Sequence, residues 1–346
     1  MATVLAVAPI LYTEAACRSP IPGLESGPYA SAMTGEEGKR PEVRTWLTYP
    51  EWYIVYSADS YGRYLASGRP PSGFSYSREI LGFWSGLCAV NRAGLASPEG
   101  AGDAKTMLYT IGVSFSAEMA VKGLYENVIG RFAEWIGGWD SPSDAYAADV
   151  WQRYGAFMHE TPWHKFPFSE TFGGLWRTKQ GDSAFRHWER RLALSLEYGV
   201  KARYAGLIGW ASGATLGADE TELRFVARGD AKAIAAIDER LRPVATSADG
   251  LVTIEAPRYA QFTDLLLKMA AAKVELVEIA GNDDIFVTLL LPPDAAPPGG
   301  GVVMLDDALG DRPGRRIGLS VKVAKLLPML RAVRAGGGTV EHVYDY

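Results

Sequence analysis

The sequence predicts an α+β protein in which an aromatic-rich N-terminal helical domain is followed by a smaller α/β domain. Three observations predict this fold class. All ten tryptophans lie between Trp46 and Trp210. Up to about residue 217, apolar residues recur every three or four positions, which is typical of amphipathic helices. Beyond that point, strand-like runs alternate with helical segments, which is typical of a mixed α/β domain.

Capping signals place the helices of the first half. Thr48 and Glu51 form a capping box, and Pro50 lies in the first turn, where a missing N–H costs nothing. Ser57 is expected to begin a second short helix. The clearest amphipathic pattern follows Ser77. The expected helices further along are 77 to 94, 103 to 136, 144 to 160 with a cap at Ser143, and 183 to 213.

The longest expected helix carries small residues along one face, where another helix is expected to pack closely. These are Ser195, Gly199, Ala202, Gly206 and Gly209.

The second half contains strand and helix signals in alternation. The expected helices are 230 to 241, 258 to 272 and 323 to 335; the expected strands are 221 to 227, 251 to 255, 274 to 280, 285 to 291, 302 to 305, 316 to 320 and 339 to 344. The strands at 274 to 280 and 285 to 291 are expected to form a hairpin. The order of elements over 251 to 344 resembles a ferredoxin-like α/β sandwich, with the preceding strand and helix as an extra unit. This resemblance concerns the fold and carries no functional motif.

The chain is expected to have four parts. Residues 1–17 form a signal-like, lipoprotein-like or peripheral segment, and the Pro- and Gly-punctuated residues 18–44 form an extended linker or a surface-draped arm. Residues 45–217 form the helical domain, and residues 218–346 form the ferredoxin-like domain.

The N-terminal segment leaves the location open. Met1 to Thr13 carries no charged side chain, and it is too short to span a bilayer. It is followed by Glu14-Ala15-Ala16-Cys17, which resembles the cleavage box of bacterial lipoproteins and makes Cys17 a lipidation candidate. However, Glu14 stands where that box has an aliphatic residue, and no Lys or Arg precedes the apolar run. A lipid-anchored or exported envelope protein and a cytoplasmic protein therefore both stay open.

Composition excludes some classes of function. A net charge of -5 without a basic face argues against nucleic acid as a partner. Two cysteines, Cys17 and Cys88, cannot make a disulfide framework, although a single pair is arithmetically allowed. The sequence does not indicate the oligomeric state.

The stretch from Trp46 to Tyr56 is the densest aromatic segment, with five aromatic residues among eleven. Tyr49, Trp52, Tyr53 and Tyr56 cover most of the circumference of one helix, so they cannot all face one core. Some of these rings must contact another element, a ligand or water. Three interpretations stay open for the aromatic excess: core packing, an interface with protein or membrane, and a pocket for a hydrophobic ligand. The candidate residues here are Trp46, Tyr49, Glu51, Trp52 and Tyr53.

Two charged groups are further candidates. Glu118 follows an apolar stretch, where a carboxylate needs a partner; Lys122, one turn later, is the expected one. Lys122 and Glu126 continue the same i, i+4, i+8 line. Arg186, Arg190 and Arg191 lie near the start of the longest helix. They are expected to form a solvated face with Glu189 interleaved, or to meet an anionic headgroup or acidic partner.

Motifs for catalysis, phosphate binding and metal binding are missing from the sequence. His159, Glu160 and His164 are better explained as surface and turn residues than as metal ligands, and no cofactor is expected. The first hypothesis is a non-catalytic interaction or assembly protein of the envelope or membrane. The alternative is a small-molecule or lipid-binding protein, or an enzyme, with a pocket in the helical domain and Glu118 or Glu51 as its polar group.

Overall fold

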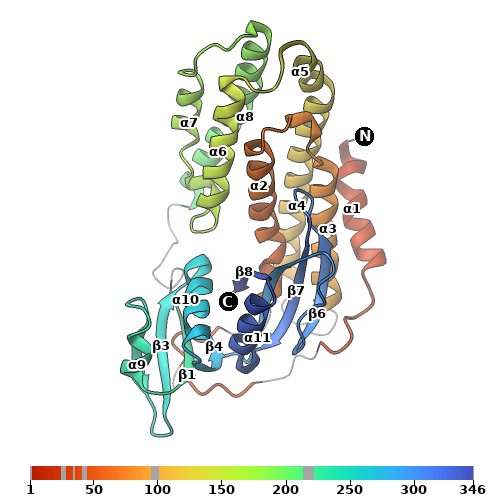
Figure 1. Ribbon diagram of the computed structural model, residues 1–346. Coiled ribbons are helices and arrows are strands. Elements are labelled where there is room, and N and C mark those ends of the chain that lie inside the picture. Colours follow the sequence, from red (N-terminus) through yellow and green to blue (C-terminus); the bar gives the residue numbers. More distant parts are fainter. Residues whose placement is uncertain are drawn as a thin grey trace. The chain divides into compact units, whose positions relative to one another are not determined.

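The structure is a computed structural model that describes residues 2–24, 29–33, 36–40, 45–94, 101–212 and 222–345. It confirms the α+β class, with helices in the N-terminal part and two four-stranded antiparallel sheets in the C-terminal part (Figure 1). The chain forms two compact units. The helical unit comprises Glu51–Trp84 and Leu108–Leu216, and the mixed unit comprises Met1–Pro50, Ser85–Met107 and Gly217–Tyr346. The domain boundary expected at residue 217 stays a prediction.

The helical unit is built from long helices and short connecting turns. Its elements, some of which continue into the mixed unit, are α2 (Tyr49–Ala66), η2 (Pro71–Gly73), α3 (Tyr76–Gly94), α4 (Ala101–Tyr125), the π-helical turn η3 (Glu126–Gly130), α5 (Arg131–Gly137), α6 (Pro142–Met158), η4 (Trp163–Lys165), α7 (Phe168–Leu175) and α8 (Ala184–Ser212).

Three differences from the expected helices lie in the helical unit; in the mixed unit, the helix expected over 230 to 241 is present only over Ala231–Ala235. Helix α2 is continuous, so Ser57 does not begin a second helix, because nothing in the sequence there breaks the hydrogen-bond ladder. Helix α6 starts after Ser141, which forms a capping box with Asp144 and lies two residues before the expected cap at Ser143. The helical path expected from 103 to 136 includes the π-helical turn η3, a local irregularity often found at functional sites.

The mixed unit begins with helix α1 (Ala2–Ala16) and η1 (Thr45–Thr48), followed later by two related α/β repeats. The first repeat consists of β1 (Glu222–Arg228), α9 (Ala231–Ala235), β2 (Arg242–Thr246), β3 (Leu251–Pro257), α10 (Tyr259–Ala271) and β4 (Glu275–Ile279). Its sheet order, β2-β3-β1-β4, is that of the ferredoxin-like fold.

The second repeat has the same strand order without the first helix. It consists of β5 (Asp284–Leu291), β6 (Gly301–Ala308), β7 (Arg315–Lys322), α11 (Val323–Ala335) and β8 (Thr339–Tyr344). The order β6-β7-β5-β8 matches β2-β3-β1-β4 strand for strand. Both sheets have register shifts at the same two strand pairs, first-to-last and second-to-third. Helices α10 and α11 both contain 13 residues.

The two repeats share one hydrophobic core. Side chains from both sheets and both long helices belong to the same buried cluster. Helices α10 and α11 contact each other, and each also contacts the last strand of the other repeat.

This arrangement corrects two predictions. The element order from β3 to β8 is not that of one ferredoxin-like unit, because β3 completes the first sheet with β1. The strands β4 and β5 are not a hairpin, because they belong to different sheets.

Part of the arm at residues 18–44 is held against the end of β4. The Glu278 carboxylate is fully buried and accepts hydrogen bonds from the Ser31 hydroxyl and from the amides of Ala32 and Met33. The Arg40 amide donates to the Ala280 carbonyl at 2.8 Å. The described part of this segment is therefore attached to the mixed unit.

Candidate functional site

Helix α8 presents an apolar surface to its surroundings. Its exposed side chains from Phe185 to Val200 recur at nearly every fourth position, and each of them is apolar. Helices α4 and α5 add a second line of exposed apolar residues, and the rings of Phe132 and Phe185 lie 6.4 Å apart between the two lines. We call this surface the apolar face; it consists of Val121, Leu124, Val128, Phe132, Trp135, Phe185, Trp188, Leu192, Leu196 and Val200.

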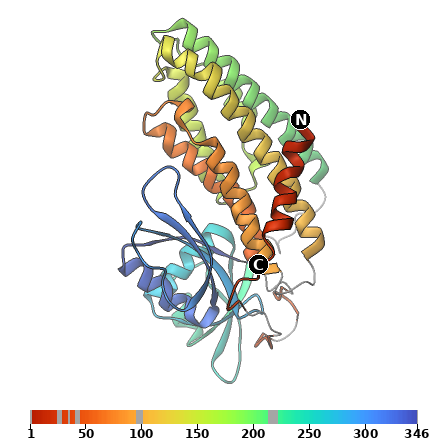
Figure 2. The same ribbon diagram turned by 90° about the vertical axis from the view of Figure 1, so that its right-hand side faces the viewer.

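Several charged side chains of α4, η3 and α8 lie between these helices, whereas Arg131 on α5 and Arg203 on α8 are exposed. The charged side chains between α4–η3 and α8 form three ion pairs, which we call the ion-pair ladder. Its members are Glu118 with Lys201 at 2.7 Å, Lys122 with Glu197 at 2.7 Å, and Glu126 with Arg190 at 2.8 Å. The helices α4 and α8 run side by side in Figure 2, and the pairs follow their antiparallel course.

The ladder corrects the expected pair between Glu118 and Lys122. Their i, i+4 spacing places both on the inward side of α4, but each side chain finds its closer partner on α8. Burial alone raises the pKa of Glu118, and the Lys201 ammonium outweighs it, so that this pKa is lowered. Burial also lowers the pKa of Lys122, and the Glu197 carboxylate offsets only part of this effect.

Arg186 and Arg190 lie in the interior, with 0% and 1% of their surface exposed. The expectation of a solvated arginine face is therefore wrong for both. Arg186 makes two hydrogen bonds to Asp144, at 2.7 and 3.2 Å, and a third to Glu189 at 2.9 Å. Arg190 pairs with Glu126 and also lies 3.3 Å from an Asp144 oxygen.

These two arginines face a surplus of carboxylates. Glu134 lies 3.9 Å from Arg186 and also accepts hydrogen bonds from Ser72. The four carboxylates that contact the two guanidiniums are Glu126, Glu134, Asp144 and Glu189. Fully ionised, this cluster would carry two uncompensated negative charges. Burial raises the pKa of Glu189 although both arginines oppose this, which favours a proton on the cluster.

Arg191 differs from its two neighbours because it is only half-buried. Its guanidinium donates to the carbonyls of Trp176 and Thr178, and it stacks over the rings of Trp176 and Trp188. It therefore forms part of the rim of the apolar face rather than of the interior.

A small cavity adjoins the ion-pair ladder at Glu118, Lys122 and Lys201. Its volume is about 40 Å³, room for roughly three water molecules. The ammonium of Lys122 lies 3.9 Å from the centre of the Trp151 ring and 4.2 Å from that of Tyr61. The indole N–H of Trp151 is buried without a hydrogen-bond partner among the described residues. The cavity thus combines aromatic walls with two ammonium groups, those of Lys122 and Lys201.

The aromatic segment at the start of α2 contributes rings to separate groups, as its helical spacing predicts. Tyr49 packs in the mixed unit against Phe286 and Tyr344, with ring centres 5.8 and 6.1 Å away. Tyr53 packs in the helical unit against Phe83 and Phe115.

The other candidates of this segment lie in different surroundings. Trp46 is buried in the mixed unit. Trp52 lies beside Tyr56 and His159 in the helical unit. Glu51 is half-buried, and burial raises the pKa of its carboxyl. These residues do not form one site.

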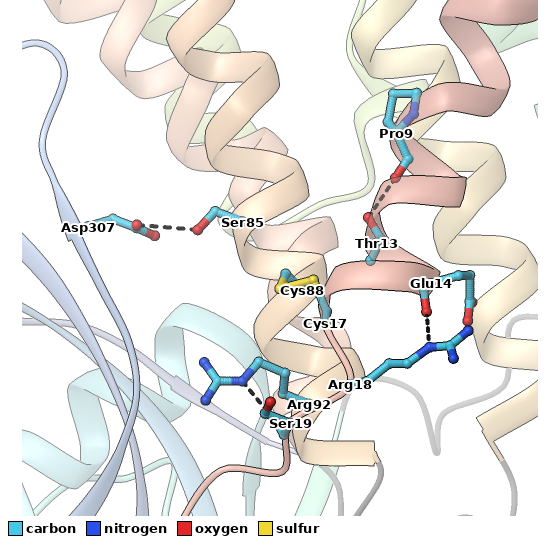
Figure 3. The surroundings of a disulfide bond; sticks show 10 residues. All are labelled: Pro9, Thr13, Glu14, Cys17, Arg18, Ser19, Ser85, Cys88, Arg92 and Asp307. Atoms are coloured by element: carbon cyan, nitrogen blue, oxygen red, sulfur yellow. Dashed lines mark hydrogen bonds between the residues drawn. A yellow bond between two sulfur atoms is a disulfide. The ribbon is translucent and has the colours of Figure 1, made fainter.

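The only two cysteines of the chain form a disulfide that joins the end of α1 to α3 (Figure 3). Both belong to the mixed unit, and Cys17 is almost fully buried. A sulfur in this bond has no free thiol to acylate, so lipidation of Cys17 and the disulfide exclude each other in one molecule. Lipidation stays a prediction.

Several partners in the charged interior were not among the sequence candidates: Asp144, Glu134, Glu197, Lys201 and Trp151. The i, i+4 spacing of Glu197 and Lys201 on the helix opposite Glu118 is the signal that could have indicated two of them. The sequence indicated Asp144 only as the first residue of a helix. Its role in the charged interior depends on an arginine 42 positions away.

No group of three or more His, Cys, Asp and Glu side chains is placed to hold a metal ion within the described residues. None of the described helices is long and apolar enough to cross a membrane. Comparisons of the chain with protein-family models, curated proteins and solved structures found no match.

Proposed function

We propose that this chain is a non-catalytic interaction protein of the cell envelope. The apolar face carries the proposal. Exposed apolar patches of several hundred Å² are uncommon on soluble monomers unless they serve an interaction. Here, the segments α4, η3, α5 and α8 direct ten large apolar side chains outward, while three ion pairs join α4–η3 to α8. Such a surface gains free energy when another apolar surface covers it.

The disulfide between Cys17 and Cys88 supports the envelope location. Disulfides persist in oxidising compartments and are rare in the reducing cytosol. The bond joins α1 to α3 within the mixed unit, so it favours a protein that matures outside the cytoplasm.

Thiol trapping in intact cells tests this location. Free thiols are blocked before lysis, and the disulfide is then reduced and labelled with a mass tag. We expect two labels per chain after reduction and none before it, in protein recovered with the envelope fraction. Fully reactive Cys17 and Cys88 in a cytosolic fraction would overturn the proposal.

A second candidate function is a ligand site in the cavity beside Lys122. The unpartnered indole N–H of Trp151 favours it, because a buried donor needs an acceptor. The volume of about 40 Å³ favours water over an organic ligand, so this function ranks second. Native mass spectrometry compares the wild-type chain with Lys122→Met. A retained mass that the variant loses would support this function, and identical bare masses would refute it.

A further inference from the structure

We infer that the apolar face lies against the acyl chains of a lipid membrane. This inference rests on the proposed function and names the partner. Its basis is the inverted polarity of this side of the helical unit, where large hydrocarbon side chains are exposed and the charged side chains of α8 up to Lys201 are buried or half-buried.

Helix α8 shows the inversion most clearly. Six charged residues lie between Phe185 and Ala202, and every one is buried or half-buried. These are Arg186, Glu189, Arg190, Arg191, Glu197 and Lys201. In water the opposite arrangement is expected, because a charge loses hydration when it is buried and an apolar side chain gains free energy. Next to lipid, paired ionic groups on the protein side and hydrocarbon on the outer side are the stable arrangement.

Several polar groups near the face are satisfied within the protein, although the Arg191 Nε is buried without a hydrogen-bond partner among the described residues. The indole N–H of Trp176 donates to the Ser195 hydroxyl at 3.0 Å, and Arg191 donates to two backbone carbonyls. The indole N–H of Trp139 donates to the Gly68 carbonyl at 3.0 Å. Hydrocarbon offers no hydrogen-bond partners, so groups next to it must be satisfied internally.

The same features favour lipid over a protein partner. Protein interfaces carry roughly one hydrogen bond per 100–200 Å² and are enriched in arginine as well as in aromatic residues and methionine. The exposed positions of α8 between Phe185 and Val200 offer apolar side chains apart from one indole N–H, that of Trp188.

Aromatic side chains occupy both ends of this line on α8. Trp188 lies at one end and Tyr204 at the other, with Leu192, Leu196 and Val200 between them. Amphipathic Trp and Tyr side chains at the margins of an aliphatic surface are typical of proteins in contact with membranes.

Vesicle flotation with the purified full-length chain tests the inference. The vesicles consist of neutral phosphatidylcholine, because an uncharged face needs no anionic lipid. We expect the wild-type chain to float with the vesicles at both low and high salt. Leu196→Lys and Leu192→Lys should each lower the partition coefficient at least about tenfold, equivalent to about 1.4 kcal/mol. The double variant should remain in the soluble fraction.

Leu81→Lys is the matched control. Leu81 on α3 is 69% exposed and Leu196 is 71% exposed, but Leu81 lies outside the apolar face. The control should float like the wild type. Circular dichroism must show equal helix content for all variants, since Leu81, Leu192 and Leu196 are all exposed and their replacement removes no core contact.

Three outcomes would overturn the inference. The wild-type chain could fail to float, or Leu81→Lys could lose binding as strongly as Leu196→Lys. Light scattering could also show a wild-type dimer that Leu196→Lys dissociates, which would assign the face to a second copy of the chain.

Failure here is distinguishable from failure of the proposed function. An oxidised disulfide in the envelope fraction without vesicle binding would leave the envelope protein intact and remove only its lipid partner. Free cysteines in the cytosol together with vesicle binding would remove the envelope location and leave the lipid partner.

Discussion

Replacing Arg190 by methionine removes a buried cation from a cluster in which two guanidiniums already face four carboxylates. The Arg190 guanidinium lies 2.8 Å from Glu126, 3.3 Å from Asp144 and 3.8 Å from Glu189, and none of these groups is appreciably exposed. The surplus of negative charge in the fully ionised cluster rises from two to three. Breaking a buried ion pair in this way costs about 3–5 kcal/mol. For a domain of this size, that lowers the melting temperature by roughly 6–20 °C.

Arg153→Met is the control for this change. Arg153 forms its ion pair with Asp149 at 2.8 Å on the same unit, but these side chains are 50% and 59% exposed. Exposed pairs contribute about 0–1 kcal/mol. Urea denaturation of both variants beside the wild type measures the two free energies of unfolding.

The pH dependence adds a second criterion. The folded-state pKa of Glu189 is raised, and Arg190 is the strongest group that lowers it. Losing Arg190 raises that pKa further, so the variant loses stability relative to the wild type as pH rises through it. The deficit should therefore be largest near pH 8 and shrink toward pH 4. A deficit below about 1 kcal/mol, or one that is constant across this pH range, would refute the ionic account of the cluster.

Three further predictions concern covalent and packing features. Cys88→Ser opens a loop of 71 residues and should lower the free energy of unfolding by about 4 kcal/mol, measured by urea denaturation. Reductant should lower it equally in the wild type. An unchanged free energy of unfolding would contradict a stabilising role of the disulfide. A Cβ at Gly62 would lie 3.0 Å from the α6 backbone, so Gly62→Ala should lower the free energy of unfolding by about 1–3 kcal/mol. At Gly206 a Cβ would meet no described atom within 4 Å, so Gly206→Ala should raise the free energy of unfolding by up to about 1 kcal/mol. Equal effects of the two substitutions would contradict the packing argument. Glu278→Ala should speed proteolysis of residues 29–40, and unchanged cleavage would mean that Glu278 does not hold this segment.

Local signals predicted some elements closely. Helix α11 and strand β8 have the expected bounds, and α10 differs by one residue at each end. Each combines a clear apolar period with a Gly, Lys or turn signal at its end. The edge strand β2 was missed, because all five of its residues are exposed and it contains a proline. Its strand conformation depends on pairing with β3 rather than on an apolar pattern.

Close packing was also predicted where it does not occur. Gly206 has open space around it, and an added Cβ at Gly199 would touch only the ring of Phe172, 3.9 Å away. Gly209 lies outside the residues whose side chains are described. Small residues at helical spacing permit a close approach but do not require one.

The charged interior was only half accessible from the sequence. The spacing of Glu118, Lys122 and Glu126 indicated one helix face correctly, since side chains four apart share a face. Their partners were not indicated, because Lys201, Glu197 and Arg190 approach from a helix about 65 to 85 residues away along the chain. Because arginine is usually exposed to water, Arg186 and Arg190 were predicted on the solvent side of the helix, whereas both are buried.

The sequence by itself determined the order and type of most elements, the confinement of tryptophan to the first part, and the divergence of the aromatic rings at the start of α2. These properties follow from local periodicity and capping, which each segment carries alone. Only the tertiary structure decided which strands share a sheet, which carboxylate meets which cation, and that Cys17 pairs with Cys88. It also decided that the apolar side of α8 faces outward. Periodicity determines which residues share a helix face. Whether other elements cover that face or leave it exposed depends on contacts between distant parts of the chain.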